Sequence, residues 1–388
     1  MRLSLILPVV EPEQLLEPER CANPKCQGKY FQMRQEVAKN VRDMQYRQVY
    51  ARRYECLRCH GTFRVYPQGV LAGQFSQRVK GLGVMLYLLG LSYGAVALVL
   101  SALGVWMSKA TVYRAVQAAA ERVPGMKREP FLQGHRAQAL GADVTSVKCN
   151  GKWLPIGITV DALTGLVLTI DQLTGEDAQS LTTWLEPIVA SVDARVLVSD
   201  DADAFKIAAD ESGLVQQVCK SHVGRNTEAL IENLSQQIQA GTDRSLAALG
   251  VDQKQALADL QHLAELIHSR QPEQQAELED LFMRYAHAPA PRSGQSATLA
   301  YRLRNLFLDR WNLWPRLTFY RTWKGASGEA LLDGTNNASE RAIGWWIKER
   351  YRSMRGYKRE RSALNVSRLI AYCGNHLAQG LDLANLVA

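Results

Sequence analysis

The sequence predicts an α/β protein whose main domain is interrupted by an all-helical insertion and preceded by two small modules. Three observations predict this class. Two cysteine pairs lie within residues 21–59, strand-like and helix-like segments alternate from residue 138 to residue 218, and residues 223–330 carry only helical periodicity. The length of 388 residues accommodates several domains of the usual size, about 50–250 residues each.

The first small module is predicted to be a zinc ribbon over residues 21–74, after a flexible and mildly acidic lead over residues 1–20. Its cysteines form one Cys-x4-Cys pair and one Cys-x2-Cys pair: Cys21, Cys26, Cys56 and Cys59. Four thiolates on two turns suit tetrahedral Zn²⁺, and His60 is an alternative ligand. Four reduced thiols without a metal are the other interpretation, but so polar a segment buries too little apolar surface to fold alone. Short, half-exposed strands are expected between the pairs.

The second module, residues 75–125, is predicted to be a helix-turn-helix. Ser92 can cap a helix that ends near Gly104, and Ser108 can cap a second helix over residues 109–121. Apolar residues at i, i+3, i+4 and i+7 give the second helix a stripe to bury. The polar residues beside that stripe are the predicted DNA contacts: Lys109, Thr111, Tyr113 and Arg114. Two packed helices that bind no DNA are the alternative interpretation.

The charge distribution favours a polyanionic partner. The net charge is +8, with 12 Lys/Arg against 3 Asp/Glu over residues 21–80 and 8 against 3 over residues 340–361. Residues 81–108 carry no charge, but glycines and serines divide them into two helices, so a single membrane span is the less favoured interpretation. Seven cysteines and no signal-peptide pattern indicate a reducing compartment, which we expect to be the cytoplasm.

The main domain is predicted to begin after a Pro- and Gly-containing linker, with its first part over residues 135–224. The expected strands are residues 138–148, 153–160, 166–173, 195–199 and 215–218, with helices over residues 177–192 and 202–209. Three antiparallel strands followed by helix, strand, helix and strand is the order of the RNase H-like fold. A helical insertion over residues 225–330 follows, with helices at 227–240, 254–268, 273–287 and 299–312. Residues 331–388 complete the domain with helices.

Three acidic residues are the candidate catalytic and cation-binding residues. Asp143 lies within an apolar strand, Asp200 ends another, and Glu340 opens a helix expected over residues 335–351. An unpaired buried carboxylate costs several kcal/mol, so acids at strand ends indicate a bound cation. Asp161 and Asp201 are the competing carboxylates, and Asp200 is preferred because it directly ends its strand.

These residues together resemble the motifs of DDE transposases, in the group that contains Mutator-like elements and related bacterial insertion sequences. The resemblance rests on Asp143, on Ser199-Asp200, on Glu340 within residues 335–341, and on Cys219-x2-His222. It covers about residues 20–375. It implies an RNase H-like catalytic domain in which Asp143, Asp200 and Glu340 hold two Mg²⁺ or Mn²⁺ ions about 3.5–4 Å apart. It also implies double-stranded DNA as the partner, both terminal repeats and target, and a homo-oligomer associated with the bacterial nucleoid.

The remaining candidates surround that site. Lys348, Arg352 and Arg355 are expected on one helix face, against DNA phosphates. Cys219 and His222 are interpreted as a structural pair near the site, because two ligands fall short of a tetrahedral set. Trp314 and Trp323 are expected in the core rather than stacked on an extruded base. The alternative functions are a catalytically silent DNA-binding regulator and an RNase H-like nuclease.

Overall fold

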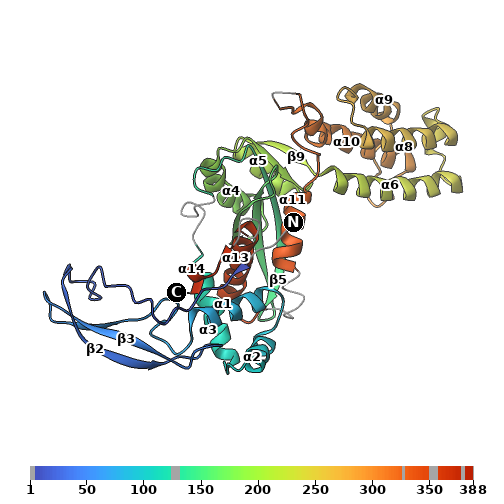
Figure 1. Ribbon diagram of the computed structural model, residues 1–388. Coiled ribbons are helices and arrows are strands. Elements are labelled where there is room, and N and C mark those ends of the chain that lie inside the picture. Colours follow the sequence, from blue (N-terminus) through green and yellow to red (C-terminus); the bar gives the residue numbers. More distant parts are fainter. Residues whose placement is uncertain (1–4, 124–131, 326–327, 349–356, 377–380, 388) are drawn as a thin grey trace. The chain divides into compact units, whose positions relative to one another are not determined.

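A computed structural model describes residues 5–123, 132–325, 328–348, 357–376 and 381–387 (Figure 1). The chain divides into two compact units. The first comprises Met1–Glu129, Ser146–Leu154 and Gly344–Ala388, and the second comprises Pro130–Thr145 and Pro155–Ile343. Within the described residues, none of the helices combines the length and the apolar character that a membrane crossing needs.

The first unit contains an antiparallel sheet of three strands, β2 (Phe31–Asn40), β3 (Gln48–Cys56) and β4 (Thr62–Val65). The first two strands form a hairpin of 10 and 9 residues, longer than the short strands expected from the sequence. The two strands pair from Phe31 and Cys56 to Asn40 and Gln48, with one shift of register between Met33 and Gln35. Most side chains of β2 are exposed, which accords with the polar sequence of this strand.

The lead over residues 1–20 is predicted to be flexible, and its described part makes several contacts within the first unit. Strand β1 (Leu5–Ile6) pairs in parallel with β10 (Leu381–Asp382), and Val10 is buried with Val41 and Val49 in a small apolar cluster. A backbone hydrogen bond from Glu11 to Gln68 adds a further tie. The described part of the lead is therefore held on the first unit by backbone pairing and by burial of a valine.

Three helices follow the sheet: α1 (Gln77–Leu88), α2 (Tyr93–Ala102) and α3 (Lys109–Glu121). The two predicted caps are confirmed, since Ser92 Oγ accepts from the Ala95 N–H at 3.1 Å and Ser108 Oγ from the Thr111 N–H at 3.2 Å. Gly104, two residues after the end of α2, has a φ of +80°. Glycine adopts this left-handed conformation, which commonly ends a helix, without steric strain. Helices α13 (Glu360–His376) and α14 (Ala384–Val387) pack against α3.

The second unit is built on a mixed five-stranded sheet in the order β7-β6-β5-β8-β9. The strands are β5 (Ala139–Cys149), β6 (Lys152–Asp161), β7 (Val167–Gln172), β8 (Val196–Ser199) and β9 (Val215–Val218). Strands β6 and β7 are antiparallel, whereas β5, β8 and β9 run parallel. The far ends of β5 and β6 belong to the first unit and are joined by Asn150-Gly151, both with positive φ, as a tight hairpin requires.

Two helices connect these strands, α4 (Ala178–Val192) and α5 (Asp203–Glu211), and they pack against each other. Trp184 of α4 lies directly over Gly157 of β6, where a Cβ would come within 2.6 Å of the indole. Asp177 caps α4 by accepting from the Ser180 N–H at 3.0 Å. The alternation of strands and helices that the sequence predicts over residues 138–218 is confirmed.

Residues 220–322 of the second unit are described as helices and connecting turns, as expected for the insertion (Figure 1). The helices are α6 (Lys220–Ala240), α7 (Ser245–Ala248), α8 (Gln253–His268), α9 (Gln275–Tyr285) and α10 (Leu299–Thr322). They share a core that includes Leu260, Leu303, Phe307 and Trp314. The sequence predicts that the last helix ends at residue 312, but α10 continues for 10 further residues, past Pro315.

The extra turns of α10 are stabilised by the sheet. The Gln217 side chain on β9 donates to the Leu317 carbonyl at 2.9 Å and accepts from the Tyr320 N–H at 2.7 Å. Tyr320 also joins Ala139 and Val198 in an apolar cluster on the sheet. These contacts offset the hydrogen bond that a proline removes from a helix interior.

Candidate active site and metal centre

The first two predicted acids lie at matching positions on neighbouring parallel strands. Gly141 of β5 pairs with Val198 of β8, so Asp143 and Asp200 each lie two residues beyond that pair, toward the carboxyl ends of the strands. On the other side of β8, Ser199 pairs with Val218 of β9, and Cys219 follows directly. The sheet therefore places Asp143, Asp200 and Cys219 along one edge.

The third predicted acid is on α11 (Asn337–Ala342), which follows a turn at Gly334 and packs closely on β5. The Asn336 side chain donates to the Ala142 carbonyl at 3.0 Å, and its backbone N–H donates to Cys219 Sγ at 3.3 Å. Gly141 permits this approach, because a Cβ there would lie 2.5 Å from Ser339 Oγ. The start of α11 is thus fixed against the strand that carries Asp143.

Glu340 itself points to the residues that follow β9. Its Oε1 lies 3.6 Å from His222 Nε2 and 3.8 Å from Cys219 Sγ. Within the described residues, these three side chains form one of two groups whose possible ligand atoms all lie within 4.8 Å of one another. The Cys-x2-His pair therefore contacts the predicted catalytic glutamate, and the sequence analysis had placed it only near the site.

Asp143 and Asp200 are not members of that close group. Asp143 Oδ1 accepts from the Val144 N–H at 2.8 Å, and Asp200 Oδ1 accepts from the Ala202 N–H at 3.1 Å. Asp143 lies within β5 and Asp200 directly follows β8, and both side chains are partly exposed. The three acids thus share one edge of the sheet, with Glu340 held toward Cys219 and His222.

The competing carboxylates are engaged elsewhere. Asp201 forms an ion pair with Lys206, at 2.9 Å between Oδ1 and Nζ. Asp161 is 3% exposed, lies 2.9 Å from the His135 imidazole and accepts from the Leu163 N–H in the turn between β6 and β7. Lys206 neutralises one of these acids and the turn occupies the other, which favours Asp200 as the acid that serves the site.

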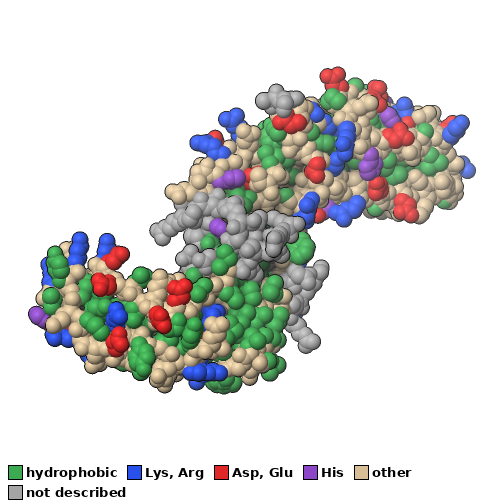
Figure 2. Space-filling model, viewed as in Figure 1, with side chains coloured by type: hydrophobic (Ala, Val, Ile, Leu, Met, Phe, Trp, Pro, Cys, Tyr) green, Lys and Arg blue, Asp and Glu red, His purple; other side chains and the backbone are tan. Residues whose placement is uncertain are grey.

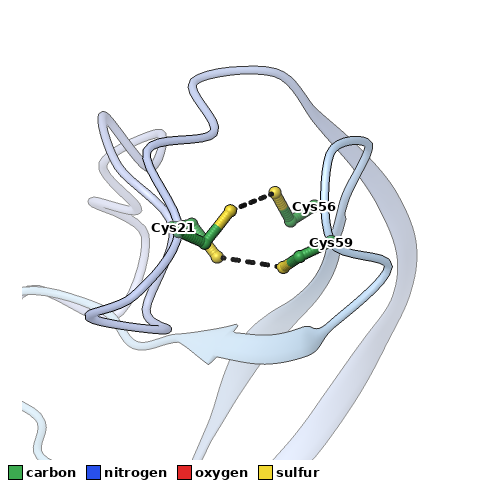
Figure 3. Close-up of side chains that lie close together, drawn as sticks. Cys21, Cys56 and Cys59 are labelled. Atoms are coloured by element: carbon green, nitrogen blue, oxygen red, sulfur yellow. Dashed lines mark hydrogen bonds between the residues drawn. The ribbon is translucent and has the colours of Figure 1, made fainter.

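The four cysteines of the first unit converge on one point (Figure 3). The sulfurs of Cys21 and Cys59 are 3.6 Å apart, and those of Cys26 and Cys56 are 3.8 Å apart. A tetrahedral zinc ion with Zn–S bonds of about 2.3 Å places its sulfurs about 3.8 Å apart. The cluster is therefore consistent with a structural Zn²⁺ site. His60 instead lies 3.1 Å from Glu55 and is outside the cluster.

The backbone around the cluster is shaped for thiolates. The N–H groups of Asn23 and Gly28 donate to Cys21 and Cys26 sulfurs at 3.4 Å each. A Cβ on Gly28 would lie 2.5 Å from Cys56 Sγ, so this position requires glycine. The pKa of the Cys56 thiol falls to about 7, chiefly because the backbone N–H of Cys59 donates to it. The pKa values of Cys21 and Cys26 are raised, because the backbone N–H groups of Asn23 and Gly28 are outweighed by burial and by side-chain hydrogen bonds within the cluster. A lowered thiol pKa favours the deprotonated form that binds metal.

The predicted DNA contacts on α3 differ in their surroundings. Lys109 and Arg114 are exposed, and Arg114 donates to Thr111 at 3.2 Å. Tyr113 is half-buried: its hydroxyl lies 3.1 Å from Ser362 Oγ and its ring packs edge-on against Tyr93. Tyr113 thus also packs within the first unit, and its contact with DNA stays a prediction.

Other predicted residues have mixed outcomes. Lys348 is exposed at the end of the π-helix η2 (Ile343–Lys348), whereas Arg352 and Arg355 lie outside the described residues. Trp314 is 2% exposed, which confirms that it packs in the core, whereas Trp323 is half-buried and stacks on Phe319 at the side of an apolar cluster. Apolar side chains also gather on the surface over α1 and α2 (Figure 2). One of them is Leu98 of α2, which is 74% exposed.

The residues that fix α11 were not predicted from the sequence. Asn336 and Ser339 are buried, and Asn336 Oδ1 and Ser339 Oγ have no hydrogen-bond partner among the described residues. Both lie within the Thr335–Arg341 segment that carries the resemblance, so the signal was present but assigned only to Glu340. No protein-family model and no curated protein sequence matches the chain.

Proposed function

We propose that this chain is a DDE-type polynucleotidyl transferase, a DNA transposase that binds element ends and catalyses their cleavage and strand transfer. The observation that carries the proposal is the common register: Asp143 within β5 and Asp200 directly after β8 lie at matching positions of adjacent parallel strands, and Glu340 is held beside the end of the next strand, β9. The strand order β7-β6-β5-β8-β9 is the order expected for an RNase H-like domain and supports the same assignment.

The donor set fits hard divalent cations. Asp143, Asp200 and Glu340 offer carboxylate oxygens, which Mg²⁺ and Mn²⁺ prefer, and all three are partly accessible to solvent. When bound, a pair of such ions lowers the pKa of an attacking water or 3′-hydroxyl and stabilises the leaving oxygen. Asn336 anchors α11 to β5 and thereby orients Glu340 toward the strand ends.

The first unit supplies features that suit DNA binding. Its four-cysteine cluster stabilises the basic β2–β3 hairpin, and α2 and α3 form the two capped helices of a helix-turn-helix. The exposed cations Lys109 and Arg114 near the start of α3 are the proposed groove contacts. Because transposition joins two element ends, we expect a homo-oligomer in the active complex.

The test is a pair of adjacent isosteric variants in the full-length protein. Asp200→Asn is expected to lower Mg²⁺-dependent cleavage and 3′-hydroxyl strand transfer at least about a thousandfold, because it removes a charge that binds the ions. Asp201→Asn, its neighbour paired with Lys206, is expected to change the rates less than about tenfold. The substrate is DNA that contains the coding sequence with its natural flanks. Equal activity of wild type and Asp200→Asn would refute the proposal.

A further inference from the structure

A basic cavity in the second unit borders the candidate active site. It has a volume of about 450 Å³, and small-ligand pockets span about 300–1,000 Å³. Five cations line it: Lys220, Arg270, Arg321, Lys324 and Arg341. Lys220 directly follows Cys219 and Arg341 directly follows Glu340, so the wall of the cavity and the candidate site use consecutive residues.

The positive charge of this cavity is not neutralised by the protein. Within the described residues, none of the five cations is within ion-pair distance of a carboxylate. The basic residues that do form ion pairs in this unit, such as Lys206, Arg284 and Arg316, do not line the cavity. Asp333 is the one acid among the lining residues, and its Oδ1 accepts from the Thr335 N–H at 2.8 Å and hydroxyl at 2.6 Å. Several unpaired cations around a concave space favour an anionic ligand.

Arg321 is built into the wall as a fixed charge. It is 4% exposed, and its guanidinium donates to the carbonyls of Gln271 and Leu266 at 2.9 Å each. It lies over the Trp314 ring, 5.0 Å from the centroid. Its Nε has no partner in the described part of the chain. A buried guanidinium held only by neutral groups retains its charge and raises the potential of the cavity.

We infer that this cavity binds a phosphate group of the DNA strand that runs to the candidate active site. The inference rests on the proposed function for the identity of the anion. Arg and Lys around a pocket recognise phosphate oxygens through charge-assisted hydrogen bonds. Lys220 follows Cys219 and Arg341 follows Glu340, so the bound phosphate would lie beside the scissile position.

The test measures binding without catalysis. Arg270 and Lys324 are exposed, so the double variant Arg270→Gln/Lys324→Gln is expected to fold. Arg244→Gln/Lys254→Gln removes two equally exposed cations that are not in the cavity and serves as the matched control. The probe is a fluorescein-labelled random 30-base-pair duplex with a single-stranded dT tail, and anisotropy is measured in EDTA across a salt series with the full-length protein.

The expected result is a change in salt dependence. Each lost phosphate contact lowers the slope of log affinity against log salt by about 0.7–0.9, so the cavity variant, which loses one phosphate, should show a slope smaller by about 0.8. The control should change the slope by less than about 0.5. An unchanged slope in the cavity variant would overturn the inference. A labelled mononucleotide is the second arm: saturable binding that the cavity variant abolishes would assign the site to a free nucleotide instead.

These outcomes are separable from those for the proposed function. The binding measurement uses EDTA and does not depend on cleavage. Normal cleavage by wild type with an unchanged salt slope in the cavity variant refutes the phosphate site alone. A reduced slope in a protein whose wild type never cleaves DNA supports the phosphate site and refutes the transposase.

Discussion

Replacing Gly141 by alanine should inactivate the protein by displacing α11. The added Cβ would lie 2.5 Å from Ser339 Oγ and 2.8 Å from Val160 Cγ2, whereas ordinary contacts begin near 3.4 Å. The difference, 3.4 minus 2.5, requires a shift of about 0.9 Å between α11 and β5. Overpacking of this kind costs about 1–3 kcal/mol of unfolding free energy. A catalytic group misplaced by about 1 Å costs about a hundredfold in rate.

Two quantities are measured for each variant, the rate of DNA cleavage and the free energy of unfolding in denaturant, because the prediction differs for the two. Gly157→Ala is the matched control: its Cβ would lie 2.6 Å from the Trp184 indole, on α4 rather than α11. Both variants should lose about 1–3 kcal/mol, but at a temperature where both are folded only Gly141→Ala should lose about a hundredfold in cleavage rate. Equal cleavage rates for the two variants would refute the reasoning.

A second variant tests the identity of the clash. Ser339→Ala removes the hydroxyl that the new Cβ meets, and that hydroxyl is buried without a partner among the described residues. The single variant should therefore cost little, and the double variant Gly141→Ala/Ser339→Ala should recover part of the lost rate. Recovery should be incomplete because the contact with Val160 remains. No recovery at all would indicate that the shift of α11 is not the cause.

Three further predictions concern the first unit. Cys56→Ser should lower the zinc content measured by a chromogenic chelator from one ion per chain to near zero and make residues 21–65 protease-sensitive; unchanged metal content would contradict the zinc site. Burial alone would raise the pKa of Asp43, but hydrogen bonds from Arg78 and Ser76 outweigh it and hold that pKa below its usual value. The ionised Asp43 carboxylate therefore stabilises the folded state at pH values above about 3.9, the pKa in the unfolded state, and this stabilisation is lost as the pH falls through the lower folded-state pKa. The difference in urea midpoint between wild type and Asp43→Asn should therefore narrow below about pH 4. A difference that stays constant with pH would contradict the depressed pKa of Asp43. Arg114→Gln should lower the salt slope for duplex DNA by about 0.9, and an unchanged slope would remove Arg114 from the DNA-binding surface.

The sequence was most informative where local chemistry decides the structure. Ser92 and Ser108 mark helix starts because a hydroxyl satisfies a backbone N–H that has no helical partner. The cysteine spacing predicted the four-sulfur cluster because ligand spacing on two turns is itself a local property. The succession of strands and helices over residues 138–218 was predicted from the alternation of patterns, since parallel strands need helical crossovers.

Prediction failed where distant residues decide the outcome. The predicted end of the last helix, residue 312, is too early because the contacts of Gln217 with Leu317 and Tyr320, which stabilise the extra turns of α10, come from a strand a hundred residues away. Tyr113 looked like a surface residue because Ser362, which contacts its hydroxyl, is 249 residues distant in the chain. The contact of Glu340 with His222 was likewise beyond any spacing rule.

The route of the chain between β9 and α11 has a consequence for folding. The contact between Cys219 and Glu340 closes a loop of 121 residues, yet the Lys220 N–H donates to the Gly334 carbonyl at 2.8 Å, so the helical region departs and returns at one point. A region with its own core keeps its two ends together once it is folded. Doubling the length of an unstructured loop adds only about 0.6 kcal/mol to its closure, and a prefolded one adds less. Additions or deletions at the tips of the helical region should therefore leave the positions of Asp143, Asp200 and Glu340 unchanged. This region is a place where the length of the chain can vary without loss of the candidate site.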